Sequence, residues 1–282
     1  MAIDLAQRRA KVIISGRTAD KSHLEAEIRK KSGNSEVHFL PMDLLSFKSV
    51  KSFVDQFSAS NDRLDILVNC AGVMLPPFQL SVEGFESQFQ TNFLGQHLLI
   101  RLLTPLLQKT AASCPEQETR IVNVTCRAFA LLASVLDVSN VRGESLTEST
   151  YDRGHYYTTS KAAFTMASLQ LSRQLADSHV TVNLAHPGVV NSRHGRHLPL
   201  FSNIIFKITF YPFFWLLTKS PWHGSQTVVF CAVADALKGV TGKYFVDLFE
   251  TPIEGMIVND EEAAKKLVEA ADEWIREGDK TE

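Results

Sequence analysis

The sequence predicts an α/β protein with a doubly wound, mostly parallel Rossmann-like sheet and helices on both faces. Short β-branched runs alternate with segments of helical period along most of the 282 residues, and no repeat or low-complexity linker interrupts them. Strands that alternate with helices imply right-handed crossovers and therefore parallel pairing. One domain is expected over residues 1–282, with a core over 1–250 and a C-terminal helical extension over 251–282.

The expected elements follow one another in a regular order. Strands are expected at residues 11–15, 36–40, 64–68, 120–125, 180–185 and 242–246. Helices are expected at 20–31, 46–57, 82–108, from about 157 to 175, 223–236 and 259–275. Two less regular stretches, 128–154 and 189–221, follow strand ends, where open α/β sheets bind ligands. We interpret residues 189–221 as a substrate lid.

Composition excludes several classes of protein. The net charge is −2, so no basic field favours nucleic acid as a partner. The four cysteines are far apart and form no Cys-x-x-Cys pair, which fits reduced thiols and argues against a metal site. The N-terminus lacks the apolar run of a signal peptide, so we expect the cytoplasm or the cytosolic face of an endomembrane. Residues 200–217 are rich in aromatics, but Asn203, Lys207 and Pro212 interrupt them too often for a membrane span.

Tyr157 and Lys161 are the first candidates for chemistry. They stand four residues apart near the start of an apolar-periodic segment, so a helix places them side by side on one face. An ammonium close to a phenol favours the phenolate and lowers its pKa towards the range useful for proton transfer. The same spacing also occurs on solvated helix faces, so the pair gains its weight from the motifs around it.

Four further motifs stand at strand ends or within a helix, in a recognisable order. They are Asp43-Leu44, Asn69-Cys70-Ala71-Gly72, Asn92 within Thr91-Asn92-Phe93-Leu94-Gly95, and Pro187-Gly188-Val189-Val190. Together with Tyr157 and Lys161, their order and spacing resemble the short-chain dehydrogenase/reductase family over about residues 1–250. Within that family the chain is most similar to the branch of the retinol dehydrogenases and the dehydrogenase X type.

The resemblance implies a role for each matching residue. Tyr157 would exchange a proton with the substrate oxygen, Lys161 would lower its pKa and hold the nicotinamide ribose, and Asn92 would hold a water in a proton relay. The residues expected at the adenosine half of the cofactor are Asp43, Leu44, Asn69, Ala71 and Gly72. Those expected at its nicotinamide end are Pro187, Gly188, Val190 and Ser192, with Tyr157 and Lys161. Taken alone, Asp43 also reads as a helix cap and Pro187-Gly188 as a plain turn.

The chain departs from the family pattern at the active-site serine. Two serines usually follow the strand that holds residues 121–124, whereas this sequence has Thr125 and Cys126 there. The second serine aligns with Cys126, whose thiol is a weak hydrogen-bond donor. Two expectations stay open: Thr125 replaces the serine after a small backbone shift, or Cys126 stands in its place and weakens catalysis. Cys126 also reads as a small buried hydrophobic residue.

A second departure concerns the phosphates of the cofactor. The family opens with a strand and a Gly-rich turn that bind the pyrophosphate, and this chain has neither. Since that first strand is central in the doubly wound order, we expect a sheet that is missing its first strand, with a gap and unpaired edges. An alternative start, a splice form or an incomplete gene model would each explain the difference. We expect the 282-residue chain to bind a dinucleotide poorly.

The end of the expected second strand predicts which cofactor is preferred. Members that bind NAD place an acidic residue there, whereas this chain has Arg17, with Lys21 one turn later. Two cations favour the 2′-phosphate of NADP(H). The alternative is that both are ordinary surface charges.

The substrate and the partners are predicted less sharply. An aromatic-rich lid suits a lipophilic alcohol or carbonyl, of the retinoid, steroid or polyprenoid type. Residues 200–217 fit a substrate lid, a peripheral membrane contact or core packing equally well, and a homodimer is compatible with the sequence. Two functions remain: an NADP(H)-dependent oxidoreductase, or a catalytically silent relative that acts through binding or oligomerisation. The gene sequence upstream of Met1 would separate them most directly.

Overall fold

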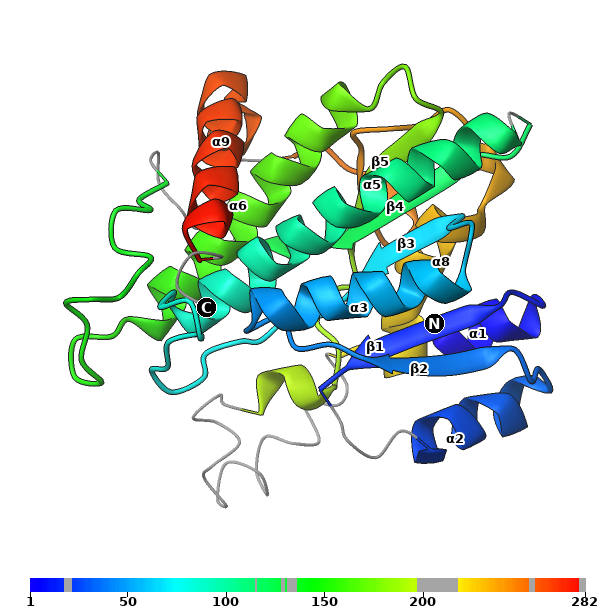
Figure 1. Cartoon of the computed structure of the whole chain (residues 1–282), viewed down its shortest axis with the longest axis horizontal. Helices are drawn as coiled ribbons and strands as arrows, with labels where there is room; N and C mark the ends of the chain where they lie inside the picture. The colour runs from blue at the N-terminus through cyan, green and yellow to red at the C-terminus, as the bar shows by residue number, and fades with distance from the viewer. Residues whose placement is uncertain are drawn as a thin grey trace.

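Parallel strands with helices on both faces form the centre of the computed structural model (Figure 1). The structure describes residues 1–17, 22–114, 116–127, 130, 136–196, 218–253 and 257–278. The strands are β1 (Val12–Gly16), β2 (Val37–Pro41), β3 (Ile66–Asn69), β4 (Thr119–Val124), β5 (Val180–His186), β6 (Tyr244–Val246) and β7 (Phe249–Glu250). All pair in parallel except β7, which is antiparallel to β6. The predicted α/β class with a mostly parallel sheet is confirmed.

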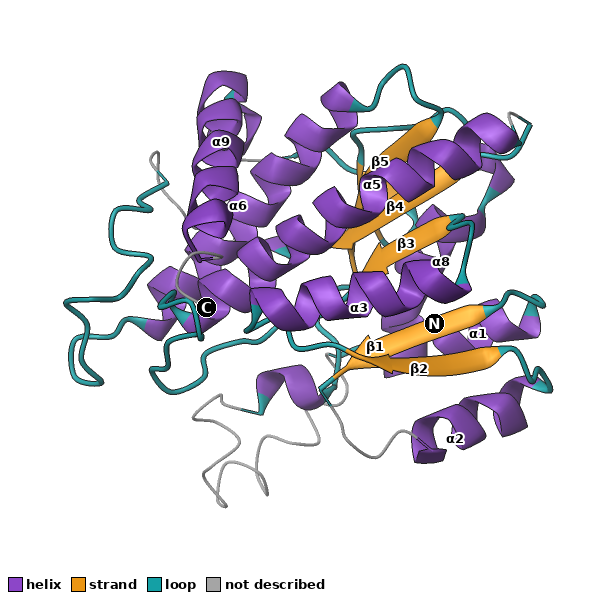
Figure 2. Ribbon diagram, viewed as in Figure 1, coloured by secondary structure: helices purple, strands orange, loops and turns teal. Residues whose placement is uncertain are grey.

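The strands fall into two separate sheets, as Figure 2 shows. One contains β1 and β2, and the other runs in the order β3-β4-β5-β6-β7. Among the described residues, no pairing joins β1 to β3. In the doubly wound order the expected first strand belongs at this position, so the predicted gap in the sheet is confirmed.

Helices cover both faces of the strands. They are α1 (Ala2–Gln7), α2 (Ser22–Ser32), α3 (Phe47–Ser60), α4 (Ser87–Phe89), α5 (Gly95–Ser113), α6 (Arg153–Gln174), α8 (Pro221–Val233) and α9 (Glu261–Gly278). A π-helix (Gln90–Leu94) joins α4 to α5, and short 3-10 turns lie at Arg193–Gly195, Asp235–Leu237 and Ile257–Asn259. The largest apolar cluster lies between the strands and α3, α5 and α6, while α8 packs on the other face (Figure 1).

Several predicted boundaries were wrong by a few residues, and the helix expected at 82–108 is wrong at both ends, since it ends at Ser113. The helix expected at 82–108 begins at Ser87, because the chain turns at Gly84, whose φ is +81°, and Glu86 then caps the helix. The Glu86 carboxylate is fully buried and accepts hydrogen bonds from the backbone N–H groups of Gln88 and Phe89. A buried carboxylate that caps the first N–H groups of a helix fixes the residue at which the helix begins.

The predicted C-terminal helix is present as α9 and packs against α6. Its buried residues recur at helical spacing: Ala264, Leu267, Val268, Ala271 and Ile275. Asp272, on the same helix, accepts a hydrogen bond from His97 Nε2 at 2.9 Å and also pairs with Arg101, both on α5. The extension therefore holds α5 and α6 together, and α6 is the helix that carries Tyr157 and Lys161.

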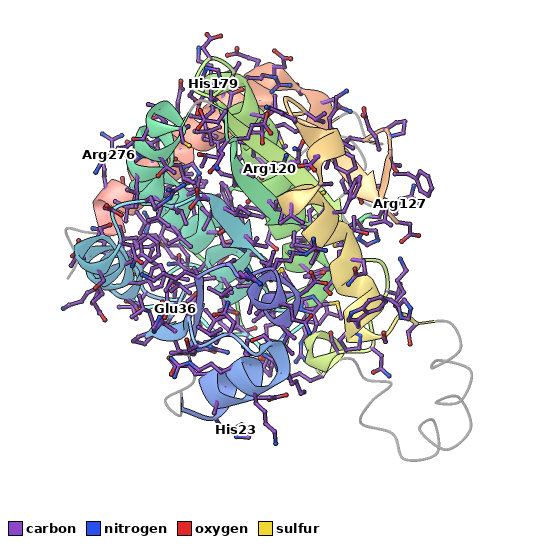
Figure 3. All side chains as sticks on the ribbon, turned by 90° about the vertical axis from the view of Figure 1, so that its right-hand side faces the viewer. His23, Glu36, Arg120, Arg127, His179 and Arg276 are labelled. Atoms are coloured by element: carbon purple, nitrogen blue, oxygen red, sulfur yellow. The ribbon has the colours of Figure 1, made fainter. Side chains whose placement is uncertain are left out.

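The parallel strands bring together the loops that carry the candidate functional residues. Figure 3 shows His179, just before β5, at the top of the molecule, and Arg127, just after β4, at its right-hand side. The carboxyl ends of parallel strands meet at one edge, where the loops after β3, β4 and β5 come together. The candidate site lies at that edge.

Candidate active site

The hydroxyl of Tyr157 lies at the centre of a small cluster of polar side chains. Tyr157 stands in the second turn of α6, whose first turn is capped by the carboxylate of Asp152. Its Oη lies 3.4 Å from the Sγ of Cys126 and 3.3 Å from the Nε2 of His194. Groups from α6, from the end of β4 and from the loop after β5 therefore meet at one phenol.

Lys161 lies one turn further along α6, as predicted, and its side chain is only 5% exposed. Its Nζ donates a hydrogen bond of 3.4 Å to the Val124 carbonyl at the end of β4. Burial lowers the pKa of this ammonium below its usual value. A Cβ added to Gly72 would lie 3.5 Å from the same nitrogen, so the glycine lets the chain after β3 run close to the lysine.

The pKa of the Tyr157 phenol moves in the opposite direction from the one expected. Burial raises this pKa above its ordinary value, and the neighbouring Cys126 raises it further. Removing a phenol from water disfavours the phenolate. Tyr157 is consequently a protonated hydroxyl at neutral pH.

Asn92 reaches the site from the π-helix. It is fully buried, its Oδ1 accepts from the Val73 N–H at 2.8 Å, and its Nδ2 donates to the Val73 carbonyl and to Ser160 Oγ, each at 3.0 Å. A π turn leaves carbonyls without their usual partners. Gln96 Nε2 donates to those of Thr91 and Asn92, at 3.2 and 3.0 Å. Asn92 therefore ties the loop after β3 to α6 just beyond Tyr157.

The two candidates for the missing serine separate clearly. Thr125 is buried, and its Oγ1 lies 2.8 Å from the hydroxyl of Thr165 on α6, away from Tyr157. Cys126 is the one whose side chain reaches the tyrosine. The expectation that Thr125 turns towards the site is therefore wrong, because its hydroxyl is engaged inside the protein and its backbone N–H is bonded to the Ala185 carbonyl.

The residues expected at the adenosine half of the cofactor lie after β1, β2 and β3. Arg17 is exposed directly after β1, while Lys21 lies outside the described residues. Asp43 Oδ1 accepts from the Leu45 N–H at 3.0 Å, so this carboxylate shapes the turn after β2, but the cap of α3 is Ser46. Leu44 is buried, with its carbonyl against the start of α5.

The loop after β3 contains both buried residues that bond within the protein and exposed residues. The side chain of Asn69 is buried and donates to Asn123 Oδ1 at 2.8 Å, so it is engaged within the sheet. Ala71 is exposed and its carbonyl accepts from Gln96 at 3.1 Å. Gly72 faces Asn92, Lys161 and the ring of His194. The loop therefore has a buried start at Asn69 and an exposed residue at Ala71, and it approaches the Tyr157 cluster at Gly72.

The residues expected at the nicotinamide end follow β5. Gly188 has a φ of +79° and lies against the side chain of Lys219. Val190 pairs with Lys219 in an isolated bridge, and Pro187 lies just before it, after the last residue of β5. Ser192 Oγ accepts from the His194 N–H at 3.3 Å. The bridge between Val190 and Lys219 fixes the backbone after β5, and His194, further along this loop, approaches Tyr157.

His194 is the member of the cluster that the sequence did not reveal. Its pKa is lowered from 6.5 to about 4, chiefly by burial and also by the nearby charges of Lys161 and Arg196. A hydrogen bond to the backbone of Gly72 acts in the opposite direction. The only available signal was its place two residues after Ser192, at the expected nicotinamide end.

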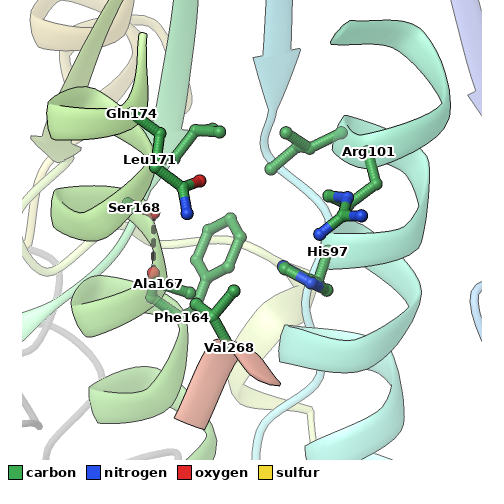
Figure 4. Close-up of a pocket in the computed structure, with 9 residues that line it drawn as sticks. His97, Arg101, Phe164, Ala167, Ser168, Leu171, Gln174 and Val268 are labelled. Atoms are coloured by element: carbon green, nitrogen blue, oxygen red, sulfur yellow. Dashed lines mark hydrogen bonds between the residues drawn. The ribbon is translucent and has the colours of Figure 1, made fainter. Parts of the chain in front are cut away.

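Other features of the described residues add no further site. No cluster of three or more His, Cys, Asp or Glu side chains is arranged for a metal within the described ranges, and no described helix is long and apolar enough to cross a membrane. A shallow cavity further along α6 is shown in Figure 4; it lies between α5, α6 and α9 and is lined by residues including His97, Phe164 and Val268. It lies apart from the Tyr157 cluster.

Comparison with known proteins identifies the chain. A tyrosine and a lysine one helical turn apart, at the carboxyl edge of a parallel α/β sheet, are typical of Rossmann-type oxidoreductases. The model of the family described as short chain dehydrogenase matches residues 1–130. Retinol dehydrogenase 13 of Homo sapiens is 36% identical over 94% of this chain and 77% of its own, and retinol dehydrogenase 11 of Mus musculus is 35% identical over 87% and 72%. The chain belongs to the short-chain dehydrogenase/reductase family, in its retinol dehydrogenase branch.

The solved structures agree with the fold. A crystal structure of an uncharacterised protein from Mycobacterium paratuberculosis superimposes with a TM-score of 0.70, at 25% identity, over 98% of this chain and 87% of that one. The complex of Pseudomonas aeruginosa RhlG with NADP superimposes with a TM-score of 0.61 at 23% identity, over 91% and 90% of the two chains. Both structures support the α/β architecture.

Proposed function

We propose that this protein interconverts a lipophilic alcohol and its carbonyl with NADP(H) as the cofactor. The observation that carries the proposal is the Tyr157 hydroxyl at the carboxyl edge of the sheet, with Cys126, His194 and Lys161 around it. The relatives named for retinol and the lipophilic character of residues 197–217 support a retinoid-like substrate over a small polar one.

Tyr157 is the proposed proton donor in the reduction of the carbonyl. Its raised pKa keeps the proton on the phenol until a substrate oxygen takes it. Lys161, one helical turn from Tyr157, is proposed to stabilise the negative charge that develops on the substrate oxygen as it takes the proton. The nicotinamide, when bound, supplies or accepts the hydride.

The cofactor assignment rests on the residues present. Tyr157, Lys161 and Gly72 converge at the proposed nicotinamide end, and Arg17 stands exposed after β1 at the proposed adenosine end. Both ends fit a dinucleotide, and the cation favours NADP(H). The pyrophosphate in the middle of the cofactor lacks a comparable site, because the Gly-rich turn is not among the 282 residues. The proposed chemistry therefore depends only on residues at the nicotinamide end.

A peripheral membrane contact is proposed for residues 200–217, which lie within the part outside the described residues. Support comes from exposed apolar residues of the loop after β5, of α8 and of the β6–β7 turn. Val189, Trp222, Leu248 and Phe249 are 64%, 61%, 45% and 74% exposed, and Lys219 links their segments through its bond to the Val189 carbonyl and its ion pair with Asp247. Exposed aromatic and aliphatic side chains at one corner suit a lipid surface. Flotation with phospholipid vesicles tests this contact.

A homodimer is proposed as well, and sedimentation of the purified chain tests it.

Replacing Tyr157 by Phe is the direct test of the enzyme. The change removes the proton donor and keeps the ring, so turnover of all-trans-retinal with NADPH should fall by about 10²–10⁴-fold while the thermal transition is retained. The matched control is Tyr156→Phe, which removes a neighbouring phenol bonded to the Asn140 carbonyl at 3.1 Å and should leave turnover close to that of the wild type. Undiminished turnover in Tyr157→Phe would contradict the proposal.

A catalytically silent binding or oligomerising relative remains the second candidate. The gap between β1 and β3 favours it, since that is where the family binds the pyrophosphate. On this reading the purified 282-residue chain binds NADPH poorly and is less stable than a family member with an unbroken sheet. Calorimetric titration with NADPH separates the two, because micromolar binding at one site per chain contradicts the silent candidate.

A further inference from the structure

We infer that His194 is a positioning residue of the active site, which accepts a hydrogen bond from Tyr157 and holds that hydroxyl towards the end of β4. The inference rests on the proposed role of Tyr157 as the proton donor. It is carried by the 3.3 Å approach of His194 Nε2 to Tyr157 Oη and by the packing of the two rings, whose centroids lie 6.1 Å apart. No motif of the sequence pointed to this histidine.

The backbone before His194 fixes where the ring goes. Asn191 N–H donates to the Lys219 carbonyl at 2.9 Å, and Lys219 N–H donates to the Val189 carbonyl at 2.8 Å. The chain then enters the 3-10 turn Arg193–Gly195, in which the His194 N–H donates to Ser192 Oγ at 3.3 Å. A residue held by bonds on both sides of the loop is placed by the fold, as a positioning role requires.

The proposed role requires one tautomer of the ring. Nε2 lies 3.3 Å from the Tyr157 hydroxyl, and it accepts a hydrogen bond only if the ring proton is on Nδ1. Nε2 is then an acceptor, and the phenol must be the donor. The charged groups that face the imidazole are Lys161 on α6 and Arg196 on its own loop, both of which disfavour a charged ring; the Cys126 thiol lies on the far side of the phenol.

This arrangement has a consequence for turnover. A phenol held by two neighbours keeps its ring and its oxygen in one position, from which the proton passes to a substrate oxygen that replaces His194 as the acceptor. A phenol without the histidine is free to move away from that position. The loss should therefore appear in kcat, since the ring makes no proposed contact with the bulk of the substrate. A role in packing alone would instead depend on the size of the side chain.

Two substitutions separate the hydrogen bond from the packing. His194→Phe keeps a ring of similar size and removes the acceptor, so kcat should fall about threefold to tenfold with KM unchanged, the range of one net hydrogen bond. His194→Gln keeps an acceptor and should restore kcat to within about twofold of the wild type. If Phe is tolerated and Gln is not, or if both behave as the wild type, the inference is wrong.

A measurement on the intact chain without substrate gives an independent answer. Nitrogen-15 spectra of histidine-labelled protein at pH 7 should show His194 with its proton on Nδ1, with the signal assigned by its absence in His194→Gln. Tyr157→Phe should shift the His194 Nε2 resonance and leave His223 on α8 unchanged. A proton on Nε2, or no shift, overturns the inference. If instead Tyr157→Phe retains full turnover while this shift is seen, the proposed function fails and the contact stands.

Discussion

Lowering the pH should destabilise this protein through His194, and the size of the effect can be worked out. The folded protein lowers the pKa of the ring from 6.5 to about 4. The neutral ring is thus favoured by folding, so its contribution is fully present above about pH 6.5 and is lost as the pH falls through 4. A pKa difference of one unit corresponds to about 1.4 kcal/mol, so the lowered pKa of His194 should reduce the free energy of unfolding by about 3 kcal/mol once the pH has fallen to about 4.

The effect is isolated by comparing the wild type with His194→Gln. Other groups also make stability depend on pH, because burial lowers the pKa of His186 and raises that of Glu86. Those contributions are common to both proteins and cancel in the difference. The His194→Gln protein should therefore gain stability relative to the wild type as the pH falls, by about 3 kcal/mol between pH 7 and pH 4.

Urea denaturation at half-unit steps of pH, followed by circular dichroism, measures the difference directly. His223→Gln is the matched control, because His223 is exposed on α8 and lies away from the Tyr157 cluster, so its curve should run parallel to that of the wild type. Parallel curves for the wild type and His194→Gln across the whole range would refute the reasoning. That result would mean that the ring is solvated and does not lie against Tyr157 and Gly72.

Three more outcomes are expected. Arg17→Asp should reverse a preference for NADPH over NADH, as measured by the two dissociation constants, and equal binding of both cofactors by the wild type would count against an NADP(H) enzyme. Cys126→Ser supplies a stronger hydrogen-bond donor beside the tyrosine and should raise turnover about threefold to tenfold, whereas Cys114→Ser should not change it; a fall in turnover would argue that the thiol is needed. Asp272→Ala leaves a buried histidine of α5 without its partner and should cost about 2 kcal/mol in urea at pH 7, while a loss below about 0.5 kcal/mol would show that α9 is held by its apolar face alone.

The fold and the tyrosine–lysine pair could be predicted because their signals are local. The periods of apolar residues mark the strands and helices, and the spacing of Tyr157 and Lys161 puts them on one helix face whatever surrounds it. The gap between β1 and β3 was predictable for a similar reason, since it follows from the order of elements along the chain. These inferences need no knowledge of what each side chain touches.

The contacts between distant segments could not be predicted in this way. Whether Thr125 or Cys126 faces the site depends on a hydroxyl of α6 that engages one of them, 40 residues along the chain. His194 depends on how the loop after β5 is pinned to Lys219. The short β7 depends on a two-residue turn in which Asp247 and Leu248 have φ values of 53° and 72°, although neither is a glycine. Each depends on three-dimensional packing that no short pattern encodes.

The same burial that overturned one expectation suggests a direction for the reaction. Removing the site from water moves three groups towards their neutral forms: it raises the pKa of Tyr157 and lowers those of Lys161 and His194. A neutral acceptor at His194 and a protonated phenol at Tyr157 form a site that already holds the proton a carbonyl needs. Oxidation of an alcohol requires the reverse, a phenolate able to take a proton, and burial disfavours that anion. In the proposed reaction, a protonated phenol suits the reduction of a carbonyl, and oxidation of the alcohol, which releases a proton, should gain on reduction as the pH rises.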